Sequence, residues 1–190
     1  MANTFNSAAS PLSEAEQALT RWGVEYKRNP DGTLVVYGAL DISNRDLTRL
    51  PDLSSVSVLG LFSCSNNFLT SLEGSPRYVE GSYYCHNNQI TSLKGGPDTI
   101  IHNFQCYNNR LTSLEGAPKT VRGFFYCQGN QLASLEYAPK GFFKLESDFG
   151  DYHTVPDELR LSPEKRAQAL AYGATVLQAP LQVRRPLTFR

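Results

Sequence analysis

The chain has 190 residues, enough for one domain with appended ends. Hydrophobic residues make up 41% of it, which is enough for a core, and Lys plus Arg equal Asp plus Glu at 18 each. This balance excludes a strong overall field that would attract nucleic acid or anionic lipid, and it argues against an acidic mimic of DNA. No apolar run approaches about 18 residues, so we expect no membrane span. Residues 1–10 lack the basic start and apolar stretch of an ordinary secretory signal, so we expect a cytoplasmic protein.

A cap is predicted over residues 1–57, and it begins with a helix. Residues 13–16, Ser-Glu-Ala-Glu, form a capping box, which places the start of the helix after Ser13. A helix of about ten residues is expected to end at Gly23. Its apolar side is predicted to hold Ala15, Ala18, Leu19 and Trp22. We expect Trp22, the only tryptophan, to plug the open end of the core.

A hairpin and a degenerate repeat are predicted to complete this cap. Two alternating segments flank a turn at residues 29–32, Asn-Pro-Asp-Gly, which is typical of a hairpin. Residues 40–51 then follow a repeat pattern in which Arg45 stands where an asparagine is expected. The inward positions of this degenerate repeat are Leu40, Ile42, Leu47 and Leu50. A cap of this kind is needed because the first turn of a stacked array would otherwise expose its apolar side.

Residues 58–139 repeat themselves every 21 residues, and one cysteine per repeat marks the period best. Each cysteine has an aromatic residue two positions before it and an asparagine three positions after it. A valine or isoleucine lies six before it, and aliphatic residues and a proline follow at fixed distances. The cysteines are Cys64, Cys85, Cys106 and Cys127; the aromatics are Phe62, Tyr83, Phe104 and Phe125; the asparagines are Asn67, Asn88, Asn109 and Asn130; the valines and isoleucine are Val58, Val79, Ile100 and Val121.

The spacing of each repeat assigns its residues to two sides of an extended segment. Residues two apart point the same way, so Phe104 and Cys106 face inward while Gln105 and Tyr107 face outward. Stacked turns then form a parallel ladder with strands about 4.8 Å apart. We expect the repeated asparagine to satisfy loop backbone groups that stacking would bury. The Gly-x-Pro ending, as in residues 116–118, supplies the return turn.

The four cysteines are interpreted as a file of small core side chains. They show no C-x-x-C pairing and no accompanying histidine pattern, so a disulfide or a metal site is the lesser alternative. Reduced thiols agree with a cytosolic protein. We expect no metal and no cofactor.

The repeats carry a resemblance to a known family. The run from Phe104 through Cys106 and Asn109 to Leu111 fills the last four marked positions of L-x-x-L-x-L-x-x-N-x-L, with cysteine in a leucine position. The chain thus resembles the short leucine-rich repeat proteins of bacteria and their phages, which carry runs such as residues 111–118, Leu-Thr-Ser-Leu-Glu-Gly-Ala-Pro. The resemblance implies a repeat solenoid with a parallel β-ladder on its concave side, irregular convex turns and a helical cap at each end. It says little about function.

A C-terminal cap helix and a basic tail are predicted over residues 140–190. The period fails after Pro139, and Asp148 stands where the next cysteine is expected. We expect the far end of the core to be closed by Phe142, Phe143, Leu145 and Phe149. Ser162 and Pro163 predict a second helix that runs to about residue 172. The tail, residues 174–190, either lies along the domain edge or docks an acidic or symmetric partner.

No motif in the chain indicates catalysis. Asp148, Asp151 and His153 form a small acid–histidine cluster without a nucleophile or a third ligand, so a solvated loop is the favoured interpretation. His86 and His102 fall on different repeats and make no joint site. Bacterial effectors with similar repeats sometimes carry a ligase domain with a catalytic cysteine, but all four cysteines here belong to the repeats. We therefore expect a protein that is not an enzyme.

The outward positions of the predicted ladder are the strongest functional candidate. They hold no Lys, Arg, Asp or Glu and are rich in the aromatic residues that dominate binding sites. The predicted partner-binding residues are Tyr84, His86, Asn103, Gln105, Tyr107, Phe124, Tyr126 and Gln128, and Leu61, Ser63, Ser65 and Ser82 complete the uncharged set. The alternative is that these residues are good strand formers that happen to be exposed.

The favoured hypothesis is a non-catalytic scaffold that binds a protein partner through this face. A phage or bacterial protein that acts on a host factor, in the bacterium or the infected cell, fits the resemblance. The alternative is a structural or assembly subunit, of a virion or a complex, that contacts its neighbours through the caps and tail. A nucleic-acid binder that stacks bases on its tyrosines lacks a basic groove. Self-association through an unpaired strand edge stays open.

Overall fold

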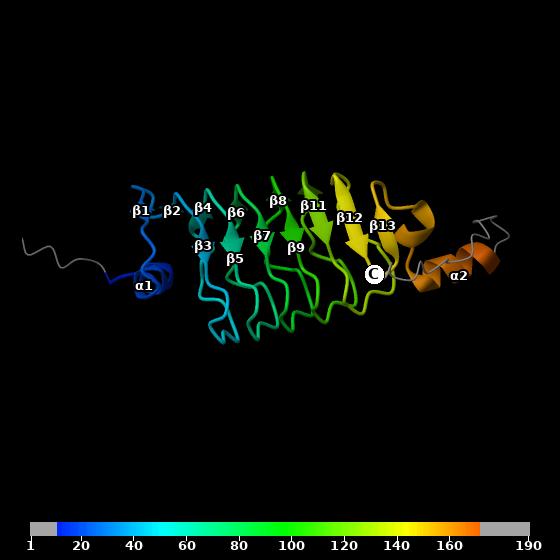
Figure 1. Ribbon diagram of the computed structural model, residues 1–190, viewed down its shortest axis with the longest axis horizontal. Helices are drawn as coiled ribbons and strands as arrows, with labels where there is room; N and C mark the ends of the chain where they lie inside the picture. Colours follow the sequence, from blue (N-terminus) through cyan, green and yellow to red (C-terminus); the bar gives the residue numbers. More distant parts are fainter. Residues whose placement is uncertain (1–10, 172–190) are drawn as a thin grey trace, which may run out of the picture.

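The computed structural model describes residues 11–171, which form a β-solenoid of about five stacked turns. The turns follow one another along the long axis of the molecule, with helix α1 at one end and helix α2 at the other (Figure 1). The predicted repeat solenoid is therefore confirmed. Residues 1–10 and the predicted tail lie outside the described residues.

Each turn contributes short strands to two sheets. The six-stranded sheet runs β1 (Lys27–Arg28), β2 (Leu34–Val36), β4 (Val56–Val58), β6 (Tyr78–Val79), β8 (Thr99–Ile100) and β10 (Thr120–Val121). The seven-stranded sheet runs β13 (Gly150–Tyr152), β12 (Lys144–Ser147), β11 (Phe124–Tyr126), β9 (Phe104–Gln105), β7 (Tyr83–Tyr84), β5 (Phe62–Ser63) and β3 (Leu40–Asp41). The pairs β1–β2 and β12–β13 are antiparallel, and the other strand pairs are parallel.

The six-stranded sheet corrects the prediction of one ladder with irregular turns opposite. The valine and isoleucine that lie six before each cysteine form strands of their own, and their side chains are buried. A sharp corner joins the two strands of a turn. A Cβ at Gly60 or Gly81 would come within 2.6 or 2.5 Å of a carbonyl oxygen of the preceding turn, so only glycine fits these corners.

The core is a stack of identical layers. The inward aromatic residues of neighbouring turns have ring centroids 5.0 to 5.5 Å apart, and all four cysteines are buried and free, as predicted. Burial raises the pKa of the Cys64 thiol to about 12, so the thiols stay protonated and act as apolar filling. Tyr83 is the one tyrosine in the aromatic file, and its hydroxyl lies 2.8 Å from the Ser75 hydroxyl. The positions equivalent to Ser75 hold Gly96, Ala117 and Ala138. In these turns the position equivalent to Tyr83 holds Phe104, Phe125 or Leu145, and none of these has a hydroxyl group.

The repeated asparagine ties each turn to the one before it. Asn88 donates from its amide nitrogen to Cys64 O at 3.0 Å and to Cys85 O at 3.2 Å, and it accepts from the Leu69 amide at 3.0 Å. Asn67, Asn109 and Asn130 make the same kinds of bonds. These bonds confirm the predicted role, because buried backbone groups cost free energy unless they find partners.

The N-terminal cap follows the prediction closely. Helix α1 (Glu14–Arg21) begins with the capping box of Ser13 and Glu16 and is eight residues long. Ala15 and Leu19 are buried against the first turn, and Trp22 packs half-buried beside them. Strands β1 and β2 form the hairpin. Leu40 and Ile42 take the inward positions of the degenerate repeat and are fully buried.

The C-terminal turn is one residue shorter than the 21-residue repeats before it. Phe125 pairs with Leu145, so the register advances by 20 residues and Ser147, not Asp148, takes the cysteine position. The expectation for Asp148 was therefore wrong by one residue. Phe142, Leu145 and Phe149 pack at the end of the core, but Phe143 is 61% exposed, which contradicts its predicted core role.

A short helix and a second α-helix follow this last turn. The 3-10 helix η1 (Asp157–Arg160) buries Leu159, whose carbonyl accepts from the Leu135 amide at 2.7 Å. Helix α2 (Pro163–Ala171) begins at the predicted Ser162 cap, whose hydroxyl accepts from the Lys165 amide. Neither α1 nor α2, nor any other helix of the described chain, has the length and apolar character that a membrane crossing requires.

Candidate partner-binding face

Strands β7, β9 and β11, with the residues directly beside them, bring the eight predicted binding residues to the outer surface of the seven-stranded sheet. These strands lie next to one another in the middle of the solenoid (Figure 1). All eight side chains are half-buried. We call these eight residues the aromatic-amide face: Tyr84, His86, Asn103, Gln105, Tyr107, Phe124, Tyr126 and Gln128.

The strand register sorts the face into rows that run across the strands. Tyr84 pairs with Gln105, and Gln105 pairs with Tyr126, so the first row is tyrosine, glutamine, tyrosine. Two ladder spacings separate the two tyrosines, which is about 10 Å. The second row, two positions later in each turn, is His86, Tyr107 and Gln128. The first row thus alternates aromatic and amide side chains, whereas the second has two adjacent rings, His86 and Tyr107, followed by an amide.

Ring contacts hold the aromatic side chains of the face in place. His86 and Tyr107 stack with centroids 4.4 Å apart and planes 6° apart. Tyr84 leans against His86 at 6.2 Å, and Phe124 stacks on Tyr126 at 5.7 Å. Side chains that are already ordered lose little conformational entropy when a partner covers them.

Hydrogen bonding divides the polar members of the face. The side-chain oxygen Oδ1 of Asn103 accepts a hydrogen bond from the Phe124 backbone amide at 3.0 Å. This side chain therefore supports the backbone of the next turn. Among residues 11–171, two buried side-chain atoms have no hydrogen-bond partner, namely His86 Nδ1 and Gln128 Oε1. Both residues flank Tyr107 in the second row. Each unsatisfied buried polar atom destabilises the folded protein by about 1 to 3 kcal/mol.

The face is electrically neutral. Burial lowers the pKa of His86, so its ring is uncharged at neutral pH. Burial also raises the pKa of Tyr126, with a further contribution from the nearby Glu146 carboxylate. The ring that stacks on Tyr107 is therefore a neutral imidazole.

Charged groups border the face on its C-terminal side, and the sequence patterns missed them. Phe124 pairs with Lys144, and Tyr126 pairs with Glu146, so β12 continues the ladder with charges. Lys144 Nζ lies 2.9 Å from Glu146 Oε1 and 3.0 Å from Asp151 Oδ2, so this cation is paired on both sides. The missing residue in the last turn hid this continuation, because a strict period assigns residues 144–146 to the wrong side.

Phe143 extends the aromatic surface at the same border. Its ring packs edge-on against Phe124 at 5.2 Å and against His153 at 5.7 Å. The side chain that was predicted to close the core is therefore a surface neighbour of the face. A Phe-Phe pair in the sequence (Phe142 and Phe143) could signal one inward and one outward ring, because adjacent residues of an extended segment point to opposite sides.

The face is smaller at its N-terminal end than the twelve uncharged positions suggested. Ser63 and Ser65 are buried, and their hydroxyl oxygens lie 3.0 Å apart. Asp41 on β3 is exposed, and its carboxylate accepts from the Ser43 amide. Small hydroxyl side chains and a charge therefore bound the aromatic part on this side.

The acid–histidine cluster does not assemble into a site. Asp148 accepts from the backbone amides of Gly129 and Asn130, Asp151 pairs with Lys144, and His153 Nδ1 lies 2.7 Å from Phe143 O. Within residues 11–171, no group of three His, Cys, Asp or Glu side chains could hold a metal ion. His102 is exposed in the corner between β8 and β9, whereas His86 belongs to the face.

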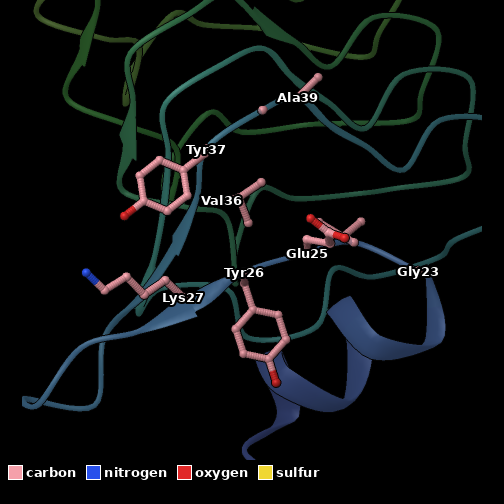
Figure 2. Close-up of a pocket in the computed structure, with 9 residues that line it drawn as sticks. Gly23, Glu25, Tyr26, Lys27, Val36, Tyr37 and Ala39 are labelled. Atoms are coloured by element: carbon pink, nitrogen blue, oxygen red, sulfur yellow. The ribbon is translucent and has the colours of Figure 1, made fainter.

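Two surface depressions lie outside the face. The first has a volume of about 460 Å³ and lies between the start of the hairpin and the end of β2; its lining is Gly23, Val24, Glu25, Tyr26, Lys27, Val36, Tyr37, Gly38 and Ala39. Figure 2 shows that the Tyr26 and Tyr37 rings do not face each other across it. The second, of about 400 Å³, is lined by Ser54, Glu73, Gly74, Ser75, Arg77, Gly95, Gly96 and Asp98. Neither brings together polar groups in an arrangement that indicates chemistry.

Comparison with known protein families, with curated proteins and with solved structures finds no match for this chain. The described residues thus define the protein as a parallel β-solenoid with about five turns. The leucine-rich repeat assignment rests on the residues of the repeat alone.

Proposed function

We propose that the protein is a non-catalytic leucine-rich repeat scaffold that binds a protein partner through the aromatic-amide face. One observation carries this proposal: eight uncharged, half-buried side chains, four of them Tyr or Phe, share one surface of a continuous sheet. Tyrosine and other aromatic residues supply most of the free energy at protein interfaces, and charged residues are depleted there.

The state of these side chains also supports binding. They are packed against one another, so a partner would meet a surface that is already ordered. The two unpaired polar atoms lie on this face and not elsewhere among the described buried side chains.

The resemblance to bacterial and phage repeat proteins suggests the setting. We propose that the partner is a host factor and that the protein acts in the cytoplasm of the bacterium or of the infected cell. Inhibition, recruitment and occlusion are all compatible with a binding scaffold. Nucleic acid is a poor candidate, because Lys144, the cation at the border of the face, is already paired with two carboxylates.

Assembly into a larger structure is the second candidate, and the sheet edges favour it. Strands β3 and β13 end the seven-stranded sheet, and each pairs with a strand on one side only. An open edge can pair with a strand of another chain. A subunit of a virion or a complex would use these ends and the terminal segments in place of the face.

An affinity capture from host lysate separates these functions. The bait is the full chain, its Tyr84→Ala/Tyr126→Ala variant, and a control variant, Tyr37→Ala/Tyr78→Ala, which removes two tyrosines that are 64% and 51% exposed outside the face. A protein that the wild type and the control retain and the face variant loses supports the proposal. A partner that all three baits retain assigns binding to the ends of the solenoid, and the proposal then fails.

A further inference from the structure

We propose that the aromatic-amide face accepts an uncharged, proline-rich segment of the partner in the polyproline II conformation, lying along the solenoid axis across β7, β9 and β11. This inference rests on the proposed function and specifies the chemistry of the partner. Its grounds are the spacing of the rings, the hydrogen-bond groups between them and the absence of charge.

The spacing of the rings matches the repeat of such a segment. Tyr84 and Tyr126 occupy the same row two turns apart, with Gln105 between them. Two ladder spacings are about 9.6 Å. A polyproline II helix has three residues per turn with a rise of about 3.1 Å, so its surface repeats every 9.3 Å or so. Side chains of the segment three residues apart would therefore meet the two tyrosines in equivalent positions.

In the second row the tyrosine takes the middle position. Tyr107 lies in the middle, between His86 and Gln128, and so faces the gap between the two tyrosines of the first row. The three tyrosines thus form a staggered set, one per turn, and the His86 and Phe124 rings lie beside them. A segment with threefold symmetry presents its successive sides in this staggered way, whereas a flat extended strand presents the same side at every second residue.

The hydrogen-bond groups of the face suit a polyproline II backbone. Such a backbone makes no internal hydrogen bonds, and each of its proline residues offers a carbonyl acceptor without an N–H donor. The Gln105 amide and the hydroxyls of Tyr84, Tyr107 and Tyr126 are donors that find no protein acceptor within residues 11–171.

The backbone of the sheet excludes the main competing mode. Strands β7, β9 and β11 are paired on both sides, so they cannot add another strand through main-chain hydrogen bonds. An occupant of the face must be held by side chains, and aromatic side chains that line a surface are the usual means of holding proline-rich segments.

The absence of charged groups on the face favours an uncharged segment. The face holds no ionised group, and the nearest cation, Lys144, is paired with Glu146 and Asp151. A charged residue of the segment would lose hydration against the rings without gaining a counter-charge. Proline, alanine and leucine side chains carry no charge, so they lose no comparable hydration free energy when they pack against the rings.

Titration of the full chain with a blocked peptide of nine prolines tests the inference, with backbone amide NMR shifts and isothermal calorimetry as readouts. A blocked peptide of nine alternating glycines and serines is the control for conformation, and a proline peptide with glutamate at every third position is the control for charge. We expect the proline peptide to shift the amides of β7, β9 and β11. We expect its affinity to fall about tenfold or more in the Tyr84→Ala/Tyr126→Ala variant, which must keep the wild-type spectrum elsewhere, and to stay unchanged in Tyr37→Ala/Tyr78→Ala.

Equal binding of the glycine-serine peptide, equal binding by the face variant, or no shift on the face at millimolar peptide would each overturn the inference. The proposed function can fail separately, because the lysate capture does not depend on the peptide. If the face variant loses a captured protein but the proline peptide does not bind, the binding face stands and its polyproline specificity is wrong.

Discussion

The outer surfaces of the two sheets are built on the same stacked turns, yet they differ in chemistry. On the six-stranded sheet the outward positions are Val35, Ser57, Tyr78, Thr99 and Thr120. They are small or β-branched except for one exposed tyrosine, and exposed ion pairs such as Lys119 with Asp98 lie beside them. On the seven-stranded sheet, the outward positions of β7, β9 and β11 hold stacked rings and amides without charge, whereas those of β3 and β12 hold Asp41, Lys144 and Glu146.

This difference bears on the interpretation that the face is only a set of good strand formers. Both sheets impose the same pleat and the same ladder, so strand propensity alone predicts similar outer surfaces. One sheet has the threonines and serines that a solvated strand favours, and the other has side chains that interfaces favour. The comparison therefore supports a role for the face beyond folding.

The repeated asparagine bridges neighbouring turns, so its loss should have the largest effect. Asn109→Ala leaves the Ile90 amide without its partner and removes one of the two asparagine donors to each of the Cys85 and Cys106 carbonyls. We expect the free energy of unfolding to fall by about 3 kcal/mol or more, measured by urea denaturation. Thr112→Ala, at an exposed position of the same turn, is the matched control and should change stability by less than about 0.5 kcal/mol. A loss for Asn109→Ala as small as that of the control would contradict the bridging role.

A buried hydroxyl pair distinguishes one layer of the core from the others. Tyr83→Phe leaves the Ser75 hydroxyl without its partner at 2.8 Å, so we expect a loss of about 1 to 3 kcal/mol. Ser75→Ala in the same background recreates the combination found at Phe125 and Ala117, and it should restore most of the loss. Urea denaturation of the four members of this cycle measures the coupling, and strictly additive losses would show that the two groups do not interact.

Much of the fold could be predicted because its signals are repeated. The inward file of cysteines and aromatics recurs at a fixed spacing, and the asparagine position has one clear task in a stacked turn. The six-stranded sheet escaped prediction because β6, β8 and β10 each have one inward residue, a valine or isoleucine, whereas the other sheet is marked by an aromatic and a cysteine two positions apart. The last turn escaped because a missing residue and the exchange of cysteine for Ser147 remove the period and its marker together.

The candidate site could be predicted in its middle and not at its borders. Tyr84, Gln105 and Tyr126 follow from the period and lie where it places them. Lys144, Glu146 and Phe143 depend on the register of the shortened turn, which only the pairing of β11 with β12 reveals. The unpaired atoms of His86 and Gln128 depend on packing between turns, which no spacing in the sequence encodes.

Protonation of His86 should have the smallest effect of those considered. Burial lowers its pKa in the folded protein, so the folded state favours the neutral ring. Above the unfolded pKa of about 6.5 the ring is neutral in both states and costs nothing. Stability is therefore lost as the pH falls below that value, and the loss is complete below the folded pKa.

Comparison of thermal unfolding between pH 7.5 and pH 5 in the wild type and in His86→Gln measures this contribution. The variant should lose less stability over this range than the wild type does. His102→Gln, at an exposed corner, should follow the wild type. An identical pH dependence in all three proteins would show that the His86 ring is not held in the neutral form by burial.

A single charge placed on either sheet tests the central claim most directly. Gln105→Lys puts a cation in the middle of the aromatic-amide face, and Thr99→Lys puts one at an outward position of the neighbouring strand in the six-stranded sheet. Both side chains lie outside the core, so both variants should fold, which circular dichroism can confirm. We predict that Gln105→Lys abolishes capture of the partner from host lysate and that Thr99→Lys leaves it intact. Capture that survives Gln105→Lys, or that both variants lose alike, would contradict the assignment of binding to the face.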